Sequence, residues 1–142
     1  MDLLLICKDG SASSLVANLL WAMQARKAGG DAAVLFSSEA LAAFTSGTFL
    51  WPRELMLQDA RLAMADSAKA QDLPIMLRGE GRQIDFHGVF AQAQQAGLPM
   101  YADPIWTDLL ALRGKLPAGI AEIDAAAGLK MLREARTIIG SL

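Results

Sequence analysis

The sequence has few of the residues that build metal, redox or covalent catalytic centres. It holds one cysteine, Cys7, and one histidine, His87, among its 142 residues. A single cysteine excludes an internal disulfide, and together with one histidine it leaves no ligand set for a structural zinc ion. We therefore predict no metal site and no cofactor, and any sulfur chemistry depends on Cys7.

Charged residues and long apolar runs are also scarce. The net charge is −2, and the thirteen lysines and arginines are scattered along the chain. Because no basic stripe forms, the sequence argues against a nucleic-acid partner. No run approaches the roughly 18 apolar residues of a membrane span, and the Met1–Asp2 start lacks the basic residues of a secretory signal. We expect a cytoplasmic protein with no membrane span.

Hydrophobic residues, in contrast, are abundant. They make up 54% of the chain, which is rich for a soluble domain. A chain of this length forms one core, so residues 1–142 are predicted to fold as a single domain. We expect the surplus apolar surface to be buried between subunits of a homo-oligomer.

The first 29 residues set the pattern for the whole chain. An apolar run at 2–7 breaks at 8–10 and is followed by a helical pattern over 11–29. The run shows no alternation, which indicates a strand buried on both faces of a parallel sheet. Further strands are predicted at 31–36, 98–102, 120–123 and 137–139, and further helices at 39–44, 54–70, 83–96, 105–112 and 125–135. This alternation predicts an α/β fold, a three-layer sandwich around a mainly parallel sheet of about five strands.

Residues 45–81 depart from this pattern. They contain too many apolar side chains for a solvated loop, so we expect them to pack as a lid or as a subunit contact. A glycine-bearing turn at 78–82 closes the segment and matches no phosphate-binding loop.

Two stretches resemble the DsrE/DsrF-like family. They are residues 3–44 (LLLICKDGSASSLVANLLWAMQARKAGGDAAVLFSSEALAAF) and 90–136 (FAQAQQAGLPMYADPIWTDLLALRGKLPAGIAEIDAAAGLKMLREAR), which are similar to that family in their placing of apolar residues and glycines. The resemblance implies a small α/β fold that assembles as a homotrimer or hexamer. Some members carry sulfur as a persulfide in an intracellular relay with partner proteins. Their cysteine follows the strand equivalent to 98–102, where this chain has Asp103, and a carboxylate cannot form a persulfide.

Cys7 is the remaining candidate for sulfur chemistry. It ends a strand at the sheet edge where parallel α/β proteins bind ligands. The helix that starts near Ser11, together with Lys8, favours a lowered thiol pKa, whereas Asp9 and Asp103 favour a raised one. The alternative is that Cys7 is a small buried hydrophobe.

A cleft is predicted where residues 7–13, 36–39 and 101–106 meet. Its candidate catalytic residues are Cys7 and Asp103, and its candidate ligand-binding residues are Lys8, Asp9, Gly10, Ser11, Ser13, Phe36, Ser37, Ser38, His87, Tyr101 and Trp106. The alternatives are structural. Asp103 caps the helix that Pro104 begins, the serines cap helices, the histidine packs or caps a helix, and the aromatic rings belong to the core or to an interface.

Three functions remain open for this cleft. The first is a sulfur carrier or sulfurtransferase that uses Cys7. The second is a small-ligand or protein-binding homo-oligomer that has lost persulfide chemistry. The third is an enzyme without sulfur chemistry that uses Asp103 with His87, and it predicts a polar pocket that holds both side chains within hydrogen-bond reach. Whether the chain is an enzyme is therefore left open.

Overall fold

The centre of the molecule is a parallel sheet. The computed structural model describes residues 1–79 and 81–140. The strands stand in the order β6-β5-β2-β1-β7, and every neighbouring pair is parallel. Their bounds are β1 Leu3–Cys7, β2 Ala32–Phe36, β5 Met100–Ala102, β6 Ala121–Glu122 and β7 Thr137–Gly140. The predicted five-stranded α/β architecture is confirmed.

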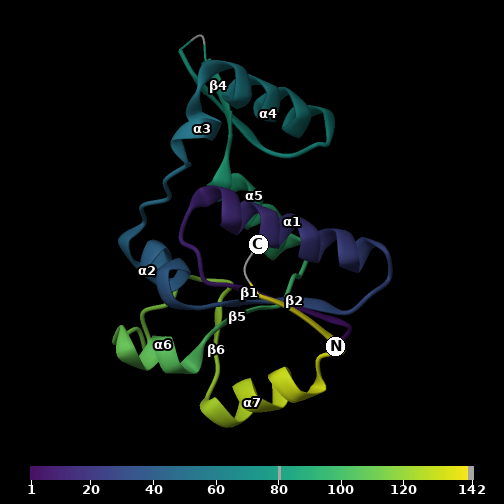
Figure 1. Ribbon diagram of the computed structural model, residues 1–142, viewed down its shortest axis with the longest axis vertical. Coiled ribbons are helices and arrows are strands. Elements are labelled where there is room, and N and C mark those ends of the chain that lie inside the picture. The colour runs from purple at the N-terminus through teal and green to yellow at the C-terminus, as the bar shows by residue number, and fades with distance from the viewer. Residues whose placement is uncertain (80, 141–142) are drawn as a thin grey trace.

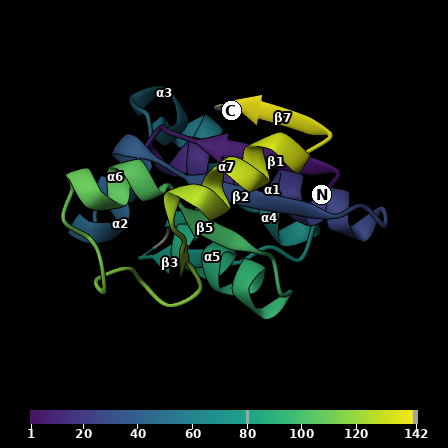
Figure 2. The ribbon, with the colours of Figure 1, turned by 90° about the horizontal axis from the view of Figure 1, so that it is seen from below.

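Helices cover the sheet on both faces. Their bounds are α1 Ala12–Lys27, α2 Ser38–Ser46, α3 Arg53–Met56, α4 Gln58–Ala70, α5 Phe86–Gln95, α6 Pro104–Leu109 and α7 Ala125–Glu134. Figures 1 and 2 show α1 and α5 on one face, called here the α1 face, and α7 on the other, called the α7 face. These layers form the expected three-layer sandwich. No helix in the described part of the chain is long and apolar enough to cross a membrane.

Successive side chains of each strand point to opposite faces of the sheet. On β1, Leu5 and Cys7 belong to the large buried cluster under α1 and α5, whereas Leu4 belongs to a small cluster beside α7. All three side chains are fully buried. This explains why the apolar run at the start of the chain shows no alternation: both faces of the strand are covered.

The five phenylalanines of the chain gather on the α1 face. Phe44 of α2 lies at the centre of this group, with its ring centroid 4.9 Å from that of Phe36 and 5.3 Å from that of Phe49. Phe86 and Phe90 of α5 complete it, at 6.1 and 5.2 Å from Phe44. The group joins the end of β2 to α2, to the linker after α2 and to α5.

The segment predicted as a lid or contact forms a small unit of its own. Helices α3 and α4 pack with an antiparallel hairpin of β3 Ile75–Arg78 and β4 Gly81–Ile84. Residues 53–79 and 81–84, called here the arm, stand beyond α1 and α5, away from the sheet (Figure 1). A bidentate ion pair ties the hairpin to α4, with Arg82 Nη2 2.8 Å from Asp66 Oδ2.

The arm corrects two of the sequence predictions. The predicted helix at 54–70 is broken at Leu57, which has extended backbone angles and separates α3 from α4. The predicted helix at 83–96 begins only at Phe86, because Gln83 and Ile84 pair with β3. In the predicted turn at 78–82, Glu80 lies outside the described residues.

Candidate functional site

The loop after β1 is clamped onto the start of α2. The Cys7 carbonyl accepts a hydrogen bond from Ser37 N at 2.9 Å, and the Lys8 carbonyl accepts one from Ala40 N at 3.0 Å. Gly10 lies against the Glu39 backbone so closely that a Cβ at this position would stand 2.7 Å from the Glu39 carbonyl oxygen. The predicted meeting of these two strand-end loops is therefore observed, and a glycine is needed at their contact.

The serines and the aspartate of this loop serve the start of α1. Asp9 Oδ1 accepts a hydrogen bond from Ser11 N at 2.8 Å, and Ser11 Oγ accepts one from Ser14 N at 3.3 Å as the N-cap of α1. Ser13 Oγ lies 3.2 Å from Ser11 Oγ. Capping satisfies N–H groups that the first helical turn leaves without partners.

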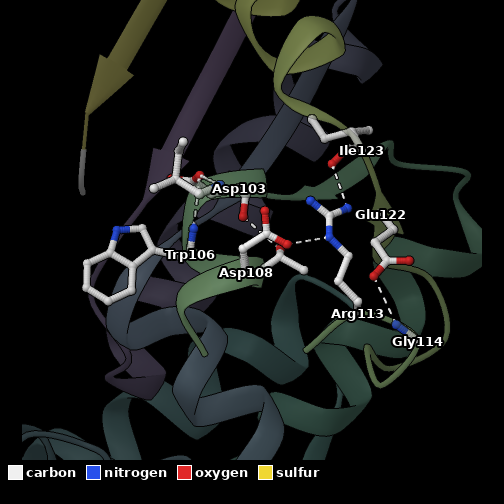
Figure 3. Close-up of polar contacts among 9 residues, drawn as sticks. Asp103, Trp106, Asp108, Arg113, Gly114, Glu122 and Ile123 are labelled. Carbon is white, nitrogen blue, oxygen red and sulfur yellow. Dashed lines mark hydrogen bonds and ion pairs between the residues drawn. The ribbon is translucent and has the colours of Figure 1, made fainter. Parts of the chain in front are cut away.

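Asp103 joins two strand ends. Its Oδ2 accepts a hydrogen bond from the buried Ser37 hydroxyl at 2.7 Å, and its Oδ1 accepts one from Ile105 N at 2.8 Å. Asp103 is thus the N-cap of α6, with Pro104 as the first helical residue (Figure 3). The capping alternative is confirmed. Ser37 gives its hydroxyl to Asp103 instead of capping α2, and the next residue, Ser38, has a left-handed φ of +50°.

Cys7 is shielded from solvent. Its side chain is fully buried, and its thiol donates a weak hydrogen bond to the Asp9 carbonyl with Sγ and O 3.5 Å apart. Burial, helped by the negative charge of Asp9, raises the pKa of the thiol to about 12. Of the two carboxylates expected from the sequence to raise this pKa, Asp9 contributes and Asp103 does not, and the main cause is burial. A neutral, enclosed thiol is a poor nucleophile.

The side chains of three predicted site residues are engaged elsewhere in the fold. Phe36 is fully buried in the phenylalanine group, so its predicted place in an open cleft is wrong. Tyr101 belongs to the cluster on the α7 face, whereas Cys7 faces α1. His87 is exposed on α5 with its ring 5.2 Å from that of Phe49, and no hydrogen bond between described residues joins it to Asp103.

Both carboxylate oxygens of Asp103 accept hydrogen bonds from Ser37 and from the backbone of α6, so the described contacts give no support to an enzyme that uses Asp103 with His87. Trp106, the last candidate, packs partly buried against the core under the α1 face. Among the residues the structure describes, no group of three or more histidine, cysteine or acidic side chains is placed to hold a metal ion.

An open hollow of about 360 Å³ lies against the β1 loop. Its lining includes three of the predicted site residues, Asp9, Gly10 and Ser11, and Glu39 from the predicted cleft segment 36–39. Sequence reasoning missed the rest of the lining, which is Thr48, Leu50, Trp51 and Pro52. The linker between α2 and the arm forms one wall, and it is fixed there because Ala12 N donates a hydrogen bond to the Leu50 carbonyl at 2.9 Å. The Trp51-Pro52 pair in a linker, half-buried in the structure, was the available signal.

A second polar cluster secures the loop after α6. Arg113 Nε lies 2.7 Å from Asp108 Oδ1, and its Nη1 donates a hydrogen bond to the Ile123 carbonyl at 3.3 Å. Glu122 Oε1 accepts a hydrogen bond from Gly114 N at 2.9 Å (Figure 3). The hydrogen bond from Arg113 lowers the pKa of Asp108. This cluster fastens the loop to β6.

Together these features define a parallel α/β protein with a shallow hollow beside the carboxyl end of β1, the edge at which such sheets bind ligands. Models of known protein families give no match to the chain, and curated proteins give none either.

Proposed function

We propose that the chain is a binding protein that carries out no persulfide chemistry and takes a small ligand in the hollow beside the β1 loop. The state of Cys7 is the observation that carries this proposal: its thiol is enclosed, and its pKa is raised to about 12. The polar groups at the neighbouring strand ends are used in caps and in the Ser37–Asp103 hydrogen bond. The hollow remains as the place at the carboxyl ends of the strands where a ligand could bind.

The lining of the hollow favours a small organic cation. Asp9 and Glu39 bring two carboxylates to it, and Trp51 with Leu50 and Pro52 brings apolar surface. Carboxylates attract an ammonium group, and an aromatic ring binds both a cation and the apolar body of a ligand. An amine attached to a ring or a short aliphatic chain fits both kinds of lining.

Three probes of nearly equal shape test this proposal. Tyramine, 4-ethylphenol and 4-hydroxyphenylacetate differ mainly in charge, which is positive, zero and negative. We expect tyramine to bind with a Kd of about 0.1–1 mM in calorimetric titration, and the other two to bind more weakly or not at all. Equal affinity for the three probes, or tighter binding of the anion, would contradict a cation site.

Glu39→Gln is the informative variant, because Asp9 also supports the start of α1. It removes one charge from the hollow and is expected to weaken tyramine binding about three- to fivefold, as for one partly exposed charge pair. Glu134→Gln on α7 is the matched control and should leave the affinity unchanged. Equal effects of both variants would show that binding depends on net charge alone.

The sulfur carrier stays as a second candidate, supported by the resemblance to DsrE/DsrF-like proteins and by the place of Cys7 at a strand end. It requires a thiol that reacts in the native state. We expect native Cys7 to resist alkylation by iodoacetamide at pH 8 and to gain no sulfur from polysulfide, as judged by intact-protein mass. A gain of one sulfur on the folded protein, abolished by Cys7→Ser, would establish the relay function and overturn our proposal.

The proposal also includes a DsrE/DsrF-like relationship, a cytoplasmic location and self-association as a homo-oligomer. Support for self-association comes from large apolar side chains exposed on several elements. They include Trp21, Leu50, Leu57, Leu77, Ile105, Leu109, Leu129, Leu132, Ile138 and Ile139. Groups of exposed apolar side chains on a protein surface mark contacts with partners. Sedimentation analysis that finds only monomer at micromolar concentration would remove this part of the proposal.

A further inference from the structure

Strand β7 is an open edge of the sheet. Within the described residues it pairs with β1 alone, and all four of its residues are exposed. Figure 2 shows it at the rim, with no strand on its outer side. The outward backbone N–H and C=O groups of such a strand are available to pair with another strand.

The edge lacks the usual protection against pairing. Thr137–Gly140 contains no charged residue and no proline, and its register with β1 is regular, Leu3 to Thr137 and Leu4 to Ile138, with no bulge. Natural sheets discourage contact at their edges with lysines, prolines and bulges. An unprotected edge with β-branched side chains favours strand addition.

Apolar side chains flank the edge on both faces. Ile138 pairs with Leu4 and so lies on the α7 face, and Ile139 pairs with Leu5 and so lies on the α1 face. They are 42% and 37% exposed. Helix α7, which leads into β7 after two residues, exposes Leu129 and Leu132 to 52% and 39%. A partner at this edge would therefore bury apolar groups above and below the strand.

We propose that β7 pairs with β7 of a second copy of this chain. A two-fold axis sets a strand antiparallel to its own copy, so the same surface serves both partners. Because Thr137–Gly140 is uncharged, the pairing places no like charges opposite each other. The inference rests on the proposed self-association and assigns a surface and a symmetry to it.

The size of the contact requires the helices as well as the strand. Four residues span only about 13 Å, whereas a stable interface buries about 800 Å² on each partner. The strand pair provides register and hydrogen bonds, and most of the apolar area has to come from side chains such as Leu129 and Leu132 on α7. The proposed contact is thus an extended sheet with a helix of each copy beside the joint.

The mass of the protein in solution is the first test. The chain has a mass of 15.1 kDa, so we expect a dimer of about 30 kDa, or an even-numbered assembly that contains this dimer, in sedimentation analysis. Ile138→Lys should weaken the association about 100-fold or more, because it brings two ammonium groups together at the axis. The matched control is Ala70→Lys at the exposed end of α4 in the arm, which should leave the association unchanged.

A charge pair gives a test that does not depend on loss of function. Chains with Ile138→Lys and chains with Ile138→Glu should each be monomeric alone and should form a mixed dimer when combined, which also shows that both variants are folded. A trimer as the native form would contradict the two-fold β7 contact and leave self-association standing. A monomer would contradict both. Association that Ile138→Lys does not weaken would place the contact elsewhere on the surface.

Discussion

The two faces of the sheet are covered very differently. On the α1 face, α1, α2 and α5 enclose a continuous core that includes Leu5, Cys7 and Phe36. On the α7 face the fully packed cluster has three buried residues, Leu4, Ala33 and Leu35. The strands are equally apolar toward both sides, so strand composition does not determine how thick the covering layer is. That thickness depends on the helices, and in this protein the layer that covers the α7 face is thin.

The thin cover has a local cause. Within α7 only Gly128 is buried, and α6 has six residues. Beyond them β6 consists of two exposed residues, and β7 is exposed along its length. Apolar surface therefore remains on the α7 side, where the β7 contact would cover part of it.

The largest expected effect compares two neighbouring leucines that are both fully buried. Leu5→Ala on the α1 face should lower the free energy of unfolding by about 4 kcal/mol, because the dense core cannot close around the cavity. Leu4→Ala on the α7 face should cost about 2.5 kcal/mol, because α7 can settle toward the sheet. Urea denaturation of both variants measures the difference. Equal costs would mean that the two faces are equally tight.

The second effect tests whether water is excluded from the core on the α1 face, where the Cys7 thiol lies. With the pKa of Cys7 raised from 9.0 to about 12, the folded protein keeps a proton that the unfolded chain releases above about pH 9. Stability is therefore complete below pH 9 and falls by about 1.4 kcal/mol per pH unit between about pH 9 and 12. Cys7→Ala should lack this slope, so the comparison of the two proteins by denaturation at pH 8 to 10.5 isolates it. Parallel stability curves would show that the thiol is hydrated in the native state.

A smaller effect is expected at the joint between the faces. Asp103 caps α6 and holds Ser37, and α6 contacts both α2 and α7. Asp103→Ala should cost about 2 kcal/mol, since it removes the cap and leaves the buried Ser37 hydroxyl without an acceptor. Asp103→Asn keeps an acceptor oxygen and should cost about half as much. A loss of less than about 0.5 kcal/mol for the alanine variant, measured by thermal unfolding, would contradict this role.

The smallest effect should have the opposite sign. Gly128 lies inside α7, where a Cβ would stand 3.3 Å from Cγ of Pro104. On a loosely packed face the proline ring can give way, so Gly128→Ala should stabilise the protein by about 0.5 kcal/mol through helix propensity. Thermal unfolding decides the sign. A destabilisation of more than about 1 kcal/mol would show that α6 and α7 are packed as tightly as the α1 face.

Local patterns in the sequence were enough to predict the sheet. The apolar runs predicted β1 and β2 to within a residue because the strands are buried on both sides. The start of α7 was also readable: the helix predicted from residue 125 begins there, and Asp124 caps it through Ala127 N at 2.8 Å. Each of these signals depends only on a few residues that are neighbours in the sequence.

Features that depend on contacts between distant residues could not be predicted. The polar sequence of β4 resembles the start of a helix, and it becomes a strand because it pairs with β3 and because Arg82 binds Asp66 of α4. The wall of the hollow depends on the hydrogen bond between Ala12 and Leu50, 38 residues apart. The burial of the candidate residues, and the face of the sheet on which each lies, were decided by tertiary packing.

The pairing of β1 with β7 has a consequence for the order of folding. Strand β1 has two neighbours in the sheet, β2 and β7, and Leu3 lies opposite Thr137 of β7. Strand β2 is available to β1 early in synthesis, whereas β7 is made more than a hundred residues later. Until then one side of β1 is an open, strongly apolar edge on the nascent chain. Synthesis pauses between β2 and β7 would prolong this exposure and increase aggregation on the ribosome.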